Sequence, residues 1–358
     1  MGSMAFWYDK DPNKADIELK SVMNFNLWTQ CSTNGESFLD IGFNVFGISA
    51  AKKLHYYIPF DTDKADVKDL SLKINNSKAI GAIFNEKYSV IDIPTSNCFW
   101  PVQNGSDQST AFVIYSWAKG NTDNIVQIYT VDDINGFCLD IDVEKFLQKI
   151  KDTPNAPFTE IDKFYFRFRV PVPHPQNADT IVRKYTPPNS FLQSTLATTY
   201  IVDFRFDDLR SLPEIISNKI IVSDSAFVPV SKLHFLLMTK AHVDVETGAQ
   251  DASLRELEEG VWEDYIETKF NTKDVVAYHC AEKVPEGQDP IKQWEFFAKL
   301  KVNNSTWSVV SIYLFALGII TICFNLLSNL LLEWLKIFFD FYGFNISIDK
   351  SVKLEYNI

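Results

Sequence analysis

The sequence lacks the residue patterns that identify most metalloproteins, disulfide-rich proteins and common hydrolases. Its five cysteines stand singly at positions 31, 98, 138, 280 and 323, with no CxxC and no Cys/His pair at zinc-site spacing. No GxSxG, HExxH, GxxxxGK[ST] or GxGxxG motif occurs. An odd number of unpaired cysteines indicates a reducing compartment. We therefore expect no metal and no cofactor, and no motif assigns an activity.

Clusters of basic residues are also missing. Lys and Arg number 34 against 46 Asp and Glu, and the formal net charge is −12. Nucleic acid carries a dense negative charge, so such a chain is repelled unless a local basic face compensates. We therefore exclude nucleic acid as a partner.

The first residues carry no secretory signal. Residues 1–16 contain Asp9, Lys10 and Asp11 and no apolar stretch of the required length. We expect the large N-terminal part to stay in the cytoplasm.

Charge disappears altogether near the C-terminus. No Asp, Glu, Lys or Arg stands between Lys301 and Glu333. About 20 apolar residues cross a hydrocarbon core of roughly 30 Å. A helix from Trp307 to Trp334 would measure roughly 40 Å, which places both tryptophans at the membrane interfaces, where Trp is favoured. We expect one transmembrane helix within 305–342, and the alternative is a buried core helix.

The second half of this segment carries a polar stripe. Asn325, Asn329, Glu333, Lys336 and Asp340 recur at the spacing of one helix face. In one interpretation the helix continues into the interface as an amphipathic segment. In the other, these residues mediate self-association of the helix in a homo-oligomer.

The N-terminal part is rich in apolar/polar alternation, which is typical of half-buried strands. We expect a β-rich domain over 17–152 that resembles an antiparallel sandwich. Its candidate strands are Phe38–Val45, Lys53–Phe60, Ala79–Phe84, Ala111–Trp117, Ile125–Val131 and Gly136–Ile141. A short helix from Val143 to Ile150, with Asp142 as its N-cap, closes this domain.

The second part, 158–300, mixes both patterns, and we expect an α+β domain packed on the first. Phe164–Val170, Val202–Phe206 and Leu233–Val243 read as strands. Ser253-Leu254-Arg255-Glu256 matches a capping box that opens a helix, and Ile291–Leu300 is assigned to a further helix.

The two ends of the chain lie outside the two expected domains. We expect residues 1–16 to form an N-terminal segment. Residues 345–358 contain the alternating apolar set Val352, Leu354, Tyr356 and Ile358, which predicts a C-terminal strand. A lone strand is unstable, so it would need a partner.

One group of charged residues is a candidate ligand site. Arg167, Arg169, Asp203, Arg205 and Asp207 alternate with Phe-rich positions on two expected strands. Arginine forks suit phosphate or carboxylate, so a small anionic ligand is one interpretation. The other is a solvated sheet face with cross-strand ion pairs.

The five histidines give no comparable signal, because no two have metal-binding spacing on one element. His279 and Cys280 are adjacent, and neighbours on a strand point to opposite faces, which disfavours a nucleophile–base pair.

These observations leave three hypotheses. The first is a single-pass, membrane-anchored cytosolic binding or sensor domain whose helix self-associates in the bilayer, with a prokaryotic antiviral-defence membrane effector as its narrower form. The second is a membrane-associated hydrolase that uses the charged strands around Asp203. The third is a passive scaffold that tethers a partner protein to the membrane.

Overall fold

The structure is a computed structural model. It describes residues 2–31, 35–84, 86–92, 98–105, 109–120, 124–153, 158, 160–174, 180–186, 197–248, 252–257, 260–266, 273–303 and 307–342. The chain divides into two compact units. Unit 1 comprises residues 1–191 and 198–302, and unit 2 comprises residues 192–197 and 303–358.

Unit 1 is mostly β. Its strands are β1 Ala5–Lys10, β2 Lys20–Trp28, β3 Ser37–Phe46, β4 Ala51–Ile58, β5 Lys68–Asp69, β6 Tyr88–Val90, β7 Phe99–Asn104, β8 Thr110–Tyr115, β9 Val126–Thr130, β10 Phe137–Asp142, β11 Lys163–Val172, β12 Val182–Tyr185, β13 Ala197–Phe206, β14 Ser225–Phe227, β15 Val230–Lys240, β16 Asp244–Thr247, β17 Ser253–Glu256, β18 Val275–Lys283 and β19 Trp294–Asn303. Its α-helices are α1 Ser77–Phe84, α2 Trp117–Gly120, α3 Val143–Lys151 and α4 Glu214–Val222.

The strands form three sheets. The largest has the order β17-β18-β15-β2-β3-β11-β8-β7-β6, with β5 paired to β11 beside this path. A five-stranded sheet has the order β14-β1-β4-β10-β9, and a four-stranded sheet the order β12-β13-β19-β16. Most neighbours are antiparallel, and β15–β2 and β11–β8 are parallel.

The main core lies between the large sheet and the two smaller ones. Phe43 of β3 stacks 6.2 Å from Tyr56 of β4, which joins the large sheet to the five-stranded sheet. Phe25 of β2 contacts Phe204 of β13 at 4.8 Å, which joins the large sheet to the four-stranded sheet. This is the packing of a β-sandwich, in which alternate side chains of facing sheets interdigitate.

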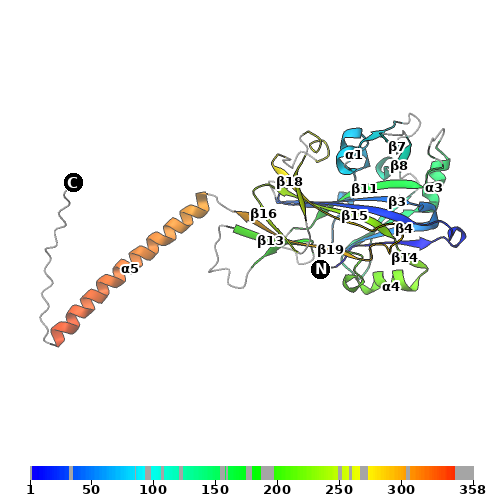
Figure 1. Ribbon diagram of the computed structural model, residues 1–358. Helices are drawn as coiled ribbons and strands as arrows, with labels where there is room; N and C mark the ends of the chain where they lie inside the picture. The colour runs from blue at the N-terminus through cyan, green and yellow to red at the C-terminus, as the bar shows by residue number, and fades with distance from the viewer. Residues whose placement is uncertain are drawn as a thin grey trace. The chain divides into compact units, whose positions relative to one another are not determined.

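Helices cover the outer faces of the sandwich. The outer face of the large sheet packs under α1 and the segment 260–266, through residues such as Ile80, Trp262 and Ile266. The outer face of the five-stranded sheet packs against α4 through Ile216 and Ile220. Figure 1 shows α1 and α4 on opposite sides of the sheets.

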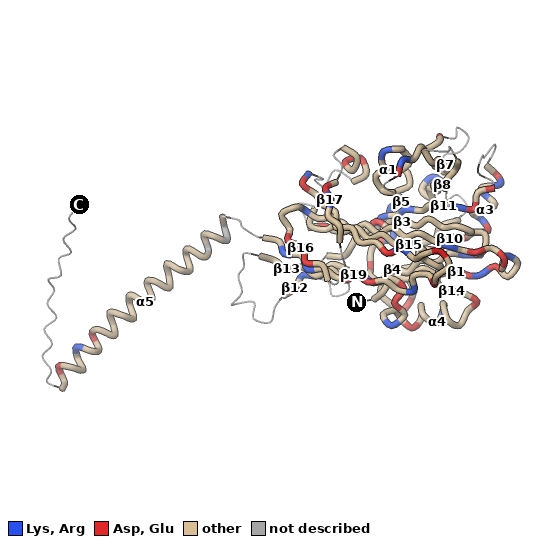
Figure 2. The backbone as a smooth tube through the Cα atoms, viewed as in Figure 1, with Lys and Arg blue, Asp and Glu red and all other residues tan. Residues whose placement is uncertain are grey.

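Unit 2 contains α5, Trp307–Phe341, a single continuous helix of 35 residues. Its stretch from Tyr313 to Phe341 is long and apolar enough to cross a membrane, and none of its most apolar window is buried. Figure 2 shows charge on α5 only toward its C-terminal end. The expected C-terminal strand at 345–358 lies outside the described residues.

The expected fold class is confirmed: a mostly β, sandwich-like protein with several helices and one long apolar C-terminal helix. The alternation in Phe38–Val45 becomes β3, and the helix expected at Val143–Ile150 becomes α3. Asp142 caps α3 as expected, because its Oδ1 accepts a hydrogen bond from Lys145 N at 3.0 Å.

Three expected elements are of the other type. Ala79–Phe84 lies in helix α1, where Asn76 Oδ1 accepts from Ala79 N at 2.9 Å and so caps the first turn. The capping box at Ser253–Glu256 is strand β17, because pairing with β18 satisfies its backbone instead. The helix expected at Ile291–Leu300 is largely strand β19, whose side chains alternate between buried and exposed from Trp294 to Lys301.

The expected domain boundary at 152–158 falls inside unit 1. Strands from both expected domains alternate in the large sheet, where β2 and β3 lie between β15 and β11. Residues 1–16 include β1, which lies between β14 and β4. The sandwich is therefore one structure assembled from distant parts of the chain.

Candidate functional site

Arg167 and Arg169 lie on the outer face of the large sheet, on strand β11, and both are buried. Arg167 is 0% exposed and Arg169 is 6% exposed. The interpretation as a solvated face is therefore wrong for these two residues. The segment 260–266, whose Tyr265 contacts both arginines, covers them.

Asp40 of β3 is the centre of a buried polar network. It lies directly opposite Arg169 in the β3–β11 ladder. Arg169 Nε and Nη2 donate to its two carboxyl oxygens at 2.6 and 3.0 Å. Trp28 Nε1 and the Tyr265 hydroxyl donate to Asp40 Oδ2 at 3.0 and 2.9 Å. Such a fully hydrogen-bonded carboxylate can remain charged inside a protein.

Arg167 joins this network through tyrosines. Its Nε lies 2.6 Å from the Tyr265 hydroxyl and its Nη1 lies 2.8 Å from the Tyr165 hydroxyl. Once the Asn26 side-chain amide is oriented to satisfy its neighbours, its oxygen accepts from Arg167 Nη2 at 2.8 Å. The network holds two guanidinium groups and one carboxylate, so it carries one positive charge in excess.

Both arginines remain charged despite their burial. Burial alone lowers the pKa of Arg169, but attraction and hydrogen bonds to Asp40 outweigh it and raise this pKa above its usual value. The pKa of Arg167 is also raised, because Tyr165, Tyr265 and Asp40 outweigh burial. Burial raises the pKa of Tyr265, so this hydroxyl keeps its proton and acts as a donor to Asp40.

Gly42 leaves the space that the network occupies. It lies opposite Arg167 in the β3–β11 ladder. A Cβ at this position would overlap the Tyr165 hydroxyl and lie 2.8 Å from Arg167 Nη1. No larger residue fits without displacing one of these side chains.

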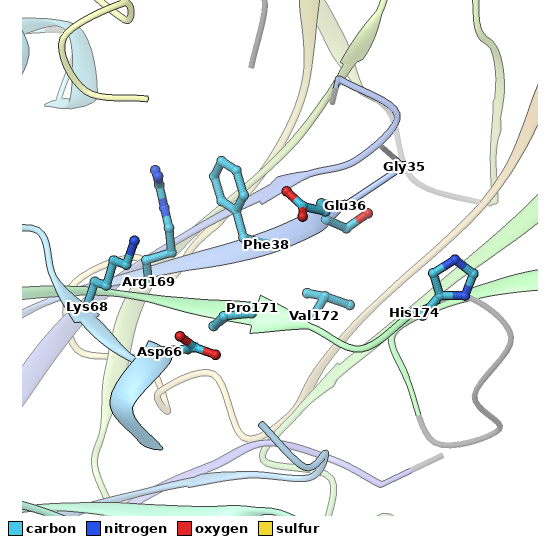
Figure 3. Close-up of a pocket in the computed structure, with 10 residues that line it drawn as sticks. Gly35, Glu36, Phe38, Asp66, Lys68, Arg169, Pro171, Val172 and His174 are labelled. Atoms are coloured by element: carbon cyan, nitrogen blue, oxygen red, sulfur yellow. The ribbon is translucent and has the colours of Figure 1, made fainter. Parts of the chain in front are cut away.

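A pocket of about 320 Å³ opens beside this network. Figure 3 shows Lys68, Arg169 and Phe38 with their side chains rising in the same direction. Lys68 of β5 lies opposite Arg169 in the sheet, and the Arg169 guanidinium stacks 3.8 Å from the Phe38 ring. The pocket is lined by Gly35, Glu36, Ser37, Phe38, Asp66, Lys68, Arg169, Pro171, Val172 and His174.

The lining of this pocket is chemically divided. Phe38, Pro171 and Val172 give apolar contact area, while Lys68 and Arg169 place two cations on one wall. Glu36 and Asp66 add two carboxyl groups elsewhere in the lining. The volume is of the order usual for a small-ligand site, and six of the ten lining residues are polar or charged.

Asp203 and Arg205 belong to another part of the molecule, on β13 of the four-stranded sheet. Arg205 Nε and Nη2 donate to the Asp203 carboxylate at 3.1 and 3.3 Å, and Arg183 Nη2 lies 3.8 Å from it. For these two residues the interpretation as ion pairs on a sheet face fits. The five expected ligand residues therefore do not form one site.

Asp207 follows β13 and is buried, at 3% exposed. Its Oδ1 accepts a hydrogen bond from Phe6 N at 2.9 Å. It lines a second cavity, separate from the pocket beside Arg169.

The polar stripe of α5 lies on an exposed helix. Asn325, Asn329, Glu333, Lys336 and Asp340 are all exposed, and so are Trp307 and Trp334. Ser311 and Thr321 each donate to the carbonyl four residues earlier, at 2.8 Å, so the helix itself satisfies these hydroxyls.

The sequence patterns missed Asp40 and Tyr265. Asp40 stands between apolar Leu39 and Ile41 and therefore reads as an ordinary outward strand residue. Tyr265 reaches it from 225 residues away in the chain. Only the register between β3 and β11, which alternation does not specify, places Asp40 opposite Arg169.

A second polar chain was also missed. It crosses all five strands of the five-stranded sheet and is centred on His55. His55 Nδ1 lies 2.8 Å from Asp140 Oδ1, and Nε2 lies 3.1 Å from Asp9 Oδ2. Ser225 of β14 donates to Asp9 at 2.7 Å, and Tyr129 of β9 donates to Asp140 at 3.1 Å. Burial alone lowers the pKa of His55, but the two carboxylates outweigh it, so this pKa is raised.

Other histidines do not assemble a metal site in the part of the chain that the structure describes. Across those ranges, no three His, Cys, Asp or Glu side chains could hold one ion. His234 and His279 stack on adjacent strands with Nδ1 and Nε2 2.9 Å apart. Burial and Lys232 lower the pKa of His234 to about 4, so the pair is uncharged near neutral pH. Cys280 is buried in the main core, and His279 lies outside it.

Comparison with known proteins assigns no family. No family model matches the chain, and no curated protein matches it. Among solved structures, it is similar to the Fcho1 Mu homology domain of Danio rerio with bound Eps15 peptide, at 9% sequence identity over 79% of this chain and 78% of that one. The TM-score is 0.15, so this likeness supports no statement about fold or function.

Proposed function

We propose that this protein is a membrane-anchored binding module that receives a small ligand in unit 1 and self-associates through α5. The observation that carries the proposal is α5: it is long and apolar enough to span a bilayer, and its apolar side chains are exposed. An apolar helix of this length is costly in water and stable in lipid. In this proposal unit 1 lies on the cytoplasmic side.

The polar side chains of α5 support self-association. Unlike Ser311 and Thr321, the Asn325 and Asn329 amides make no hydrogen bond within the described residues of α5. An amide without a partner costs several kcal/mol in hydrocarbon. A second copy of the helix supplies a partner of matching chemistry, because an amide both donates and accepts.

The ligand site of this proposal is the pocket beside Arg169. The buried network has one excess positive charge, and Lys68 places a second cation next to Arg169. These charges attract an anionic group, and Phe38, Pro171 and Val172 accommodate an apolar part. Glu36 and Asp66 would reject a ligand that carries several negative charges.

The anchor is tested by a truncation. A chain that ends after Asn303 keeps all of β19, whereas ending at Lys301 would remove its last residues. We expect the full chain to stay with membranes after alkaline extraction and the truncated chain to be released. Release of both chains would contradict the anchor.

Self-association is tested by cross-linking in bilayers of low protein content. We expect the full chain to give oligomers, and an Asn325→Leu/Asn329→Leu variant to give mainly monomers while remaining membrane-bound. A matched control is Leu326→Ala/Leu330→Ala, on another face of α5. Equal oligomer yields for all three chains would contradict the role of the two asparagines.

The narrower form of this proposal is a membrane effector of prokaryotic antiviral defence. It rests on architecture alone, namely a binding unit joined to a self-associating helix. Its readout is membrane potential in cells that express the full chain, compared with the Asn325→Leu/Asn329→Leu variant. If neither chain changes the membrane potential, the protein is a ligand-binding membrane anchor without effector activity.

The two other hypotheses have less support. The hydrolase hypothesis used the charged strands around Asp203, whose carboxylate is engaged by Arg205 and Arg183. The passive scaffold hypothesis does not account for the pocket beside Arg169.

A further inference from the structure

Asp207 adopts an unusual conformation directly after β13. Its φ is +54°, in the left-handed region that costs a non-glycine residue free energy and recurs at functional sites. Met4 O accepts a hydrogen bond from Asp207 N at 2.8 Å, and Asp207 Oδ1 accepts one from Phe6 N. Contacts to Met4 and to Phe6 of β1 therefore hold both the backbone and one carboxyl oxygen.

The remaining carboxyl oxygen of Asp207 has no such contact. The hydrogen bond from Phe6 N is the only one that its carboxyl group makes within the described residues. The residue is nearly fully buried and borders a cavity of about 350 Å³. An oxygen without a protein partner at the edge of a cavity can hydrogen-bond to water or to a ligand.

The walls of this cavity are largely apolar. Three segments line it, namely residues 207–210, 227–229 and 290–293. The side chains that give apolar contact are Leu209, Phe227, Val228, Pro229, Pro290 and Ile291.

The charged groups at the cavity already have counter-charges. Arg210 Nε donates to Asp208 Oδ1 at 3.0 Å, and Lys292 Nζ lies 3.1 Å from Asp289 Oδ2. Burial raises the pKa of Asp207 well above its usual value, which favours the neutral form of its carboxyl group. A cavity whose charges cancel disfavours an ionic ligand, because burial strips the ligand of water without offering an opposite charge.

We propose that this cavity binds an uncharged carboxamide with a small apolar body, whose carbonyl oxygen accepts a hydrogen bond from the carboxyl O–H of Asp207. The amide N–H can donate back to the same carboxyl group, so the two groups are complementary. The site is separate from the pocket beside Arg169, with which it shares no lining residue.

Binding is measured with the full chain in detergent, by ligand-observed NMR and titration calorimetry. The probes are propionamide, isovaleramide and benzamide, each compared with its carboxylate at neutral pH. We expect at least one amide to bind and its carboxylate to bind roughly tenfold more weakly, because the cavity offers the carboxylate no counter-charge. Absence of binding for all three amides, or equal binding of the carboxylates, would overturn the proposal.

Substitutions of Asp207 identify the hydrogen bond. Asn tolerates the left-handed region and retains both an acceptor for Phe6 N and a donor for the ligand. We therefore expect Asp207→Asn to keep amide affinity within about threefold, while Asp207→Gly, which fits the backbone without the side chain, loses roughly tenfold. Equal loss in both variants would contradict the assigned donor.

The pH profile separates this role from a structural one. The titratable groups near Asp207 are Asp208 and Arg210 in the same turn, Lys292 on another lining segment, and Tyr56 of β4. The pKa of Tyr56 is raised mainly by burial and secondly by Asp207. As the pH rises through the pKa of Asp207, the wild-type chain loses its O–H donor. Amide affinity should then fall in wild type and stay constant in Asp207→Asn. A Leu209→Trp variant, which enlarges a lining side chain, should weaken binding at every pH. Parallel pH profiles for wild type and Asp207→Asn would contradict the proposal.

Discussion

Arg169 lies directly opposite Asp40 in the ladder between β11 and β3, and its guanidinium donates two hydrogen bonds to that carboxylate. This pair is the only contact in the described network that joins opposite charges. Trp28 and Tyr265, from two other segments of the chain, donate two further hydrogen bonds to the Asp40 carboxylate. The wall of the proposed ligand pocket therefore depends on one buried carboxylate.

We predict that Asp40→Asn destabilises the protein strongly. Two guanidinium groups would remain buried without a carboxylate, and breaking one partner of a buried ion pair costs about 3–5 kcal/mol. The free energy of unfolding, from urea denaturation followed by tryptophan fluorescence, measures this loss. An apolar pair, Asp40→Leu/Arg169→Met, should recover part of it, and a loss below about 1 kcal/mol for Asp40→Asn would speak against the network as described.

Gly42→Ala should also destabilise, by about 1–3 kcal/mol, because the added methyl group overlaps the Tyr165 hydroxyl. Gly248→Ala is a matched control, since its Cβ would lie 3.5 Å or more from its neighbours. Removal of the clashing hydroxyl in Gly42→Ala/Tyr165→Phe should restore part of the stability. Equal thermal midpoints for Gly42→Ala and Gly248→Ala would contradict this packing.

The His55 cluster should make stability depend on pH. The folded pKa of His55 is raised above its unfolded value of about 6.5, so its contribution is complete below that pH and is lost as the pH rises through the folded value. The hydrogen bond from His55 lowers the pKa of Asp9, so the contribution of Asp9 is present above its unfolded value and is lost as the pH falls through the folded one.

Denaturation of wild type and His55→Gln across this range tests the cluster. We expect the difference in the free energy of unfolding to be largest between about pH 5 and 6.5 and to shrink toward alkaline pH, since Gln carries no charge. A difference that does not change with pH would show that His55 is uncharged in the folded protein.

Residue patterns within single segments correctly predicted some individual strands and helices. Alternation identified β3, and Asp142 with the spacing of Val143, Phe146 and Ile150 identified α3. The same alternation is present in β19, at Trp294, Phe296, Ala298 and Leu300, so the helix expected at Ile291–Leu300 is wrong. The capping box at Ser253–Glu256 failed because pairing with β18 outweighs a weak local preference.

The candidate site was predictable only in part. The charged positions on β11 and β13 were identified, but their burial and grouping depend on contacts between distant segments. Residues 260–266 bury Arg167 and Arg169, and the position of β13 in a different sheet separates Asp203 from them. Neither relationship leaves a periodic signal in the sequence.

The proposed membrane anchor requires α5 to cross the bilayer, and site-specific labelling measures this. Cys323, within α5, is the one native cysteine with an exposed side chain, so a Cys323→Ala background leaves only buried native thiols. Single cysteines are then placed at Asn303, at the end of β19, and at Tyr342, directly after α5. With intact cells and a membrane-impermeant maleimide, we predict labelling of Tyr342→Cys only, and labelling of Asn303→Cys only after the membrane is opened. Labelling of both positions from the same side would show that α5 does not span the membrane.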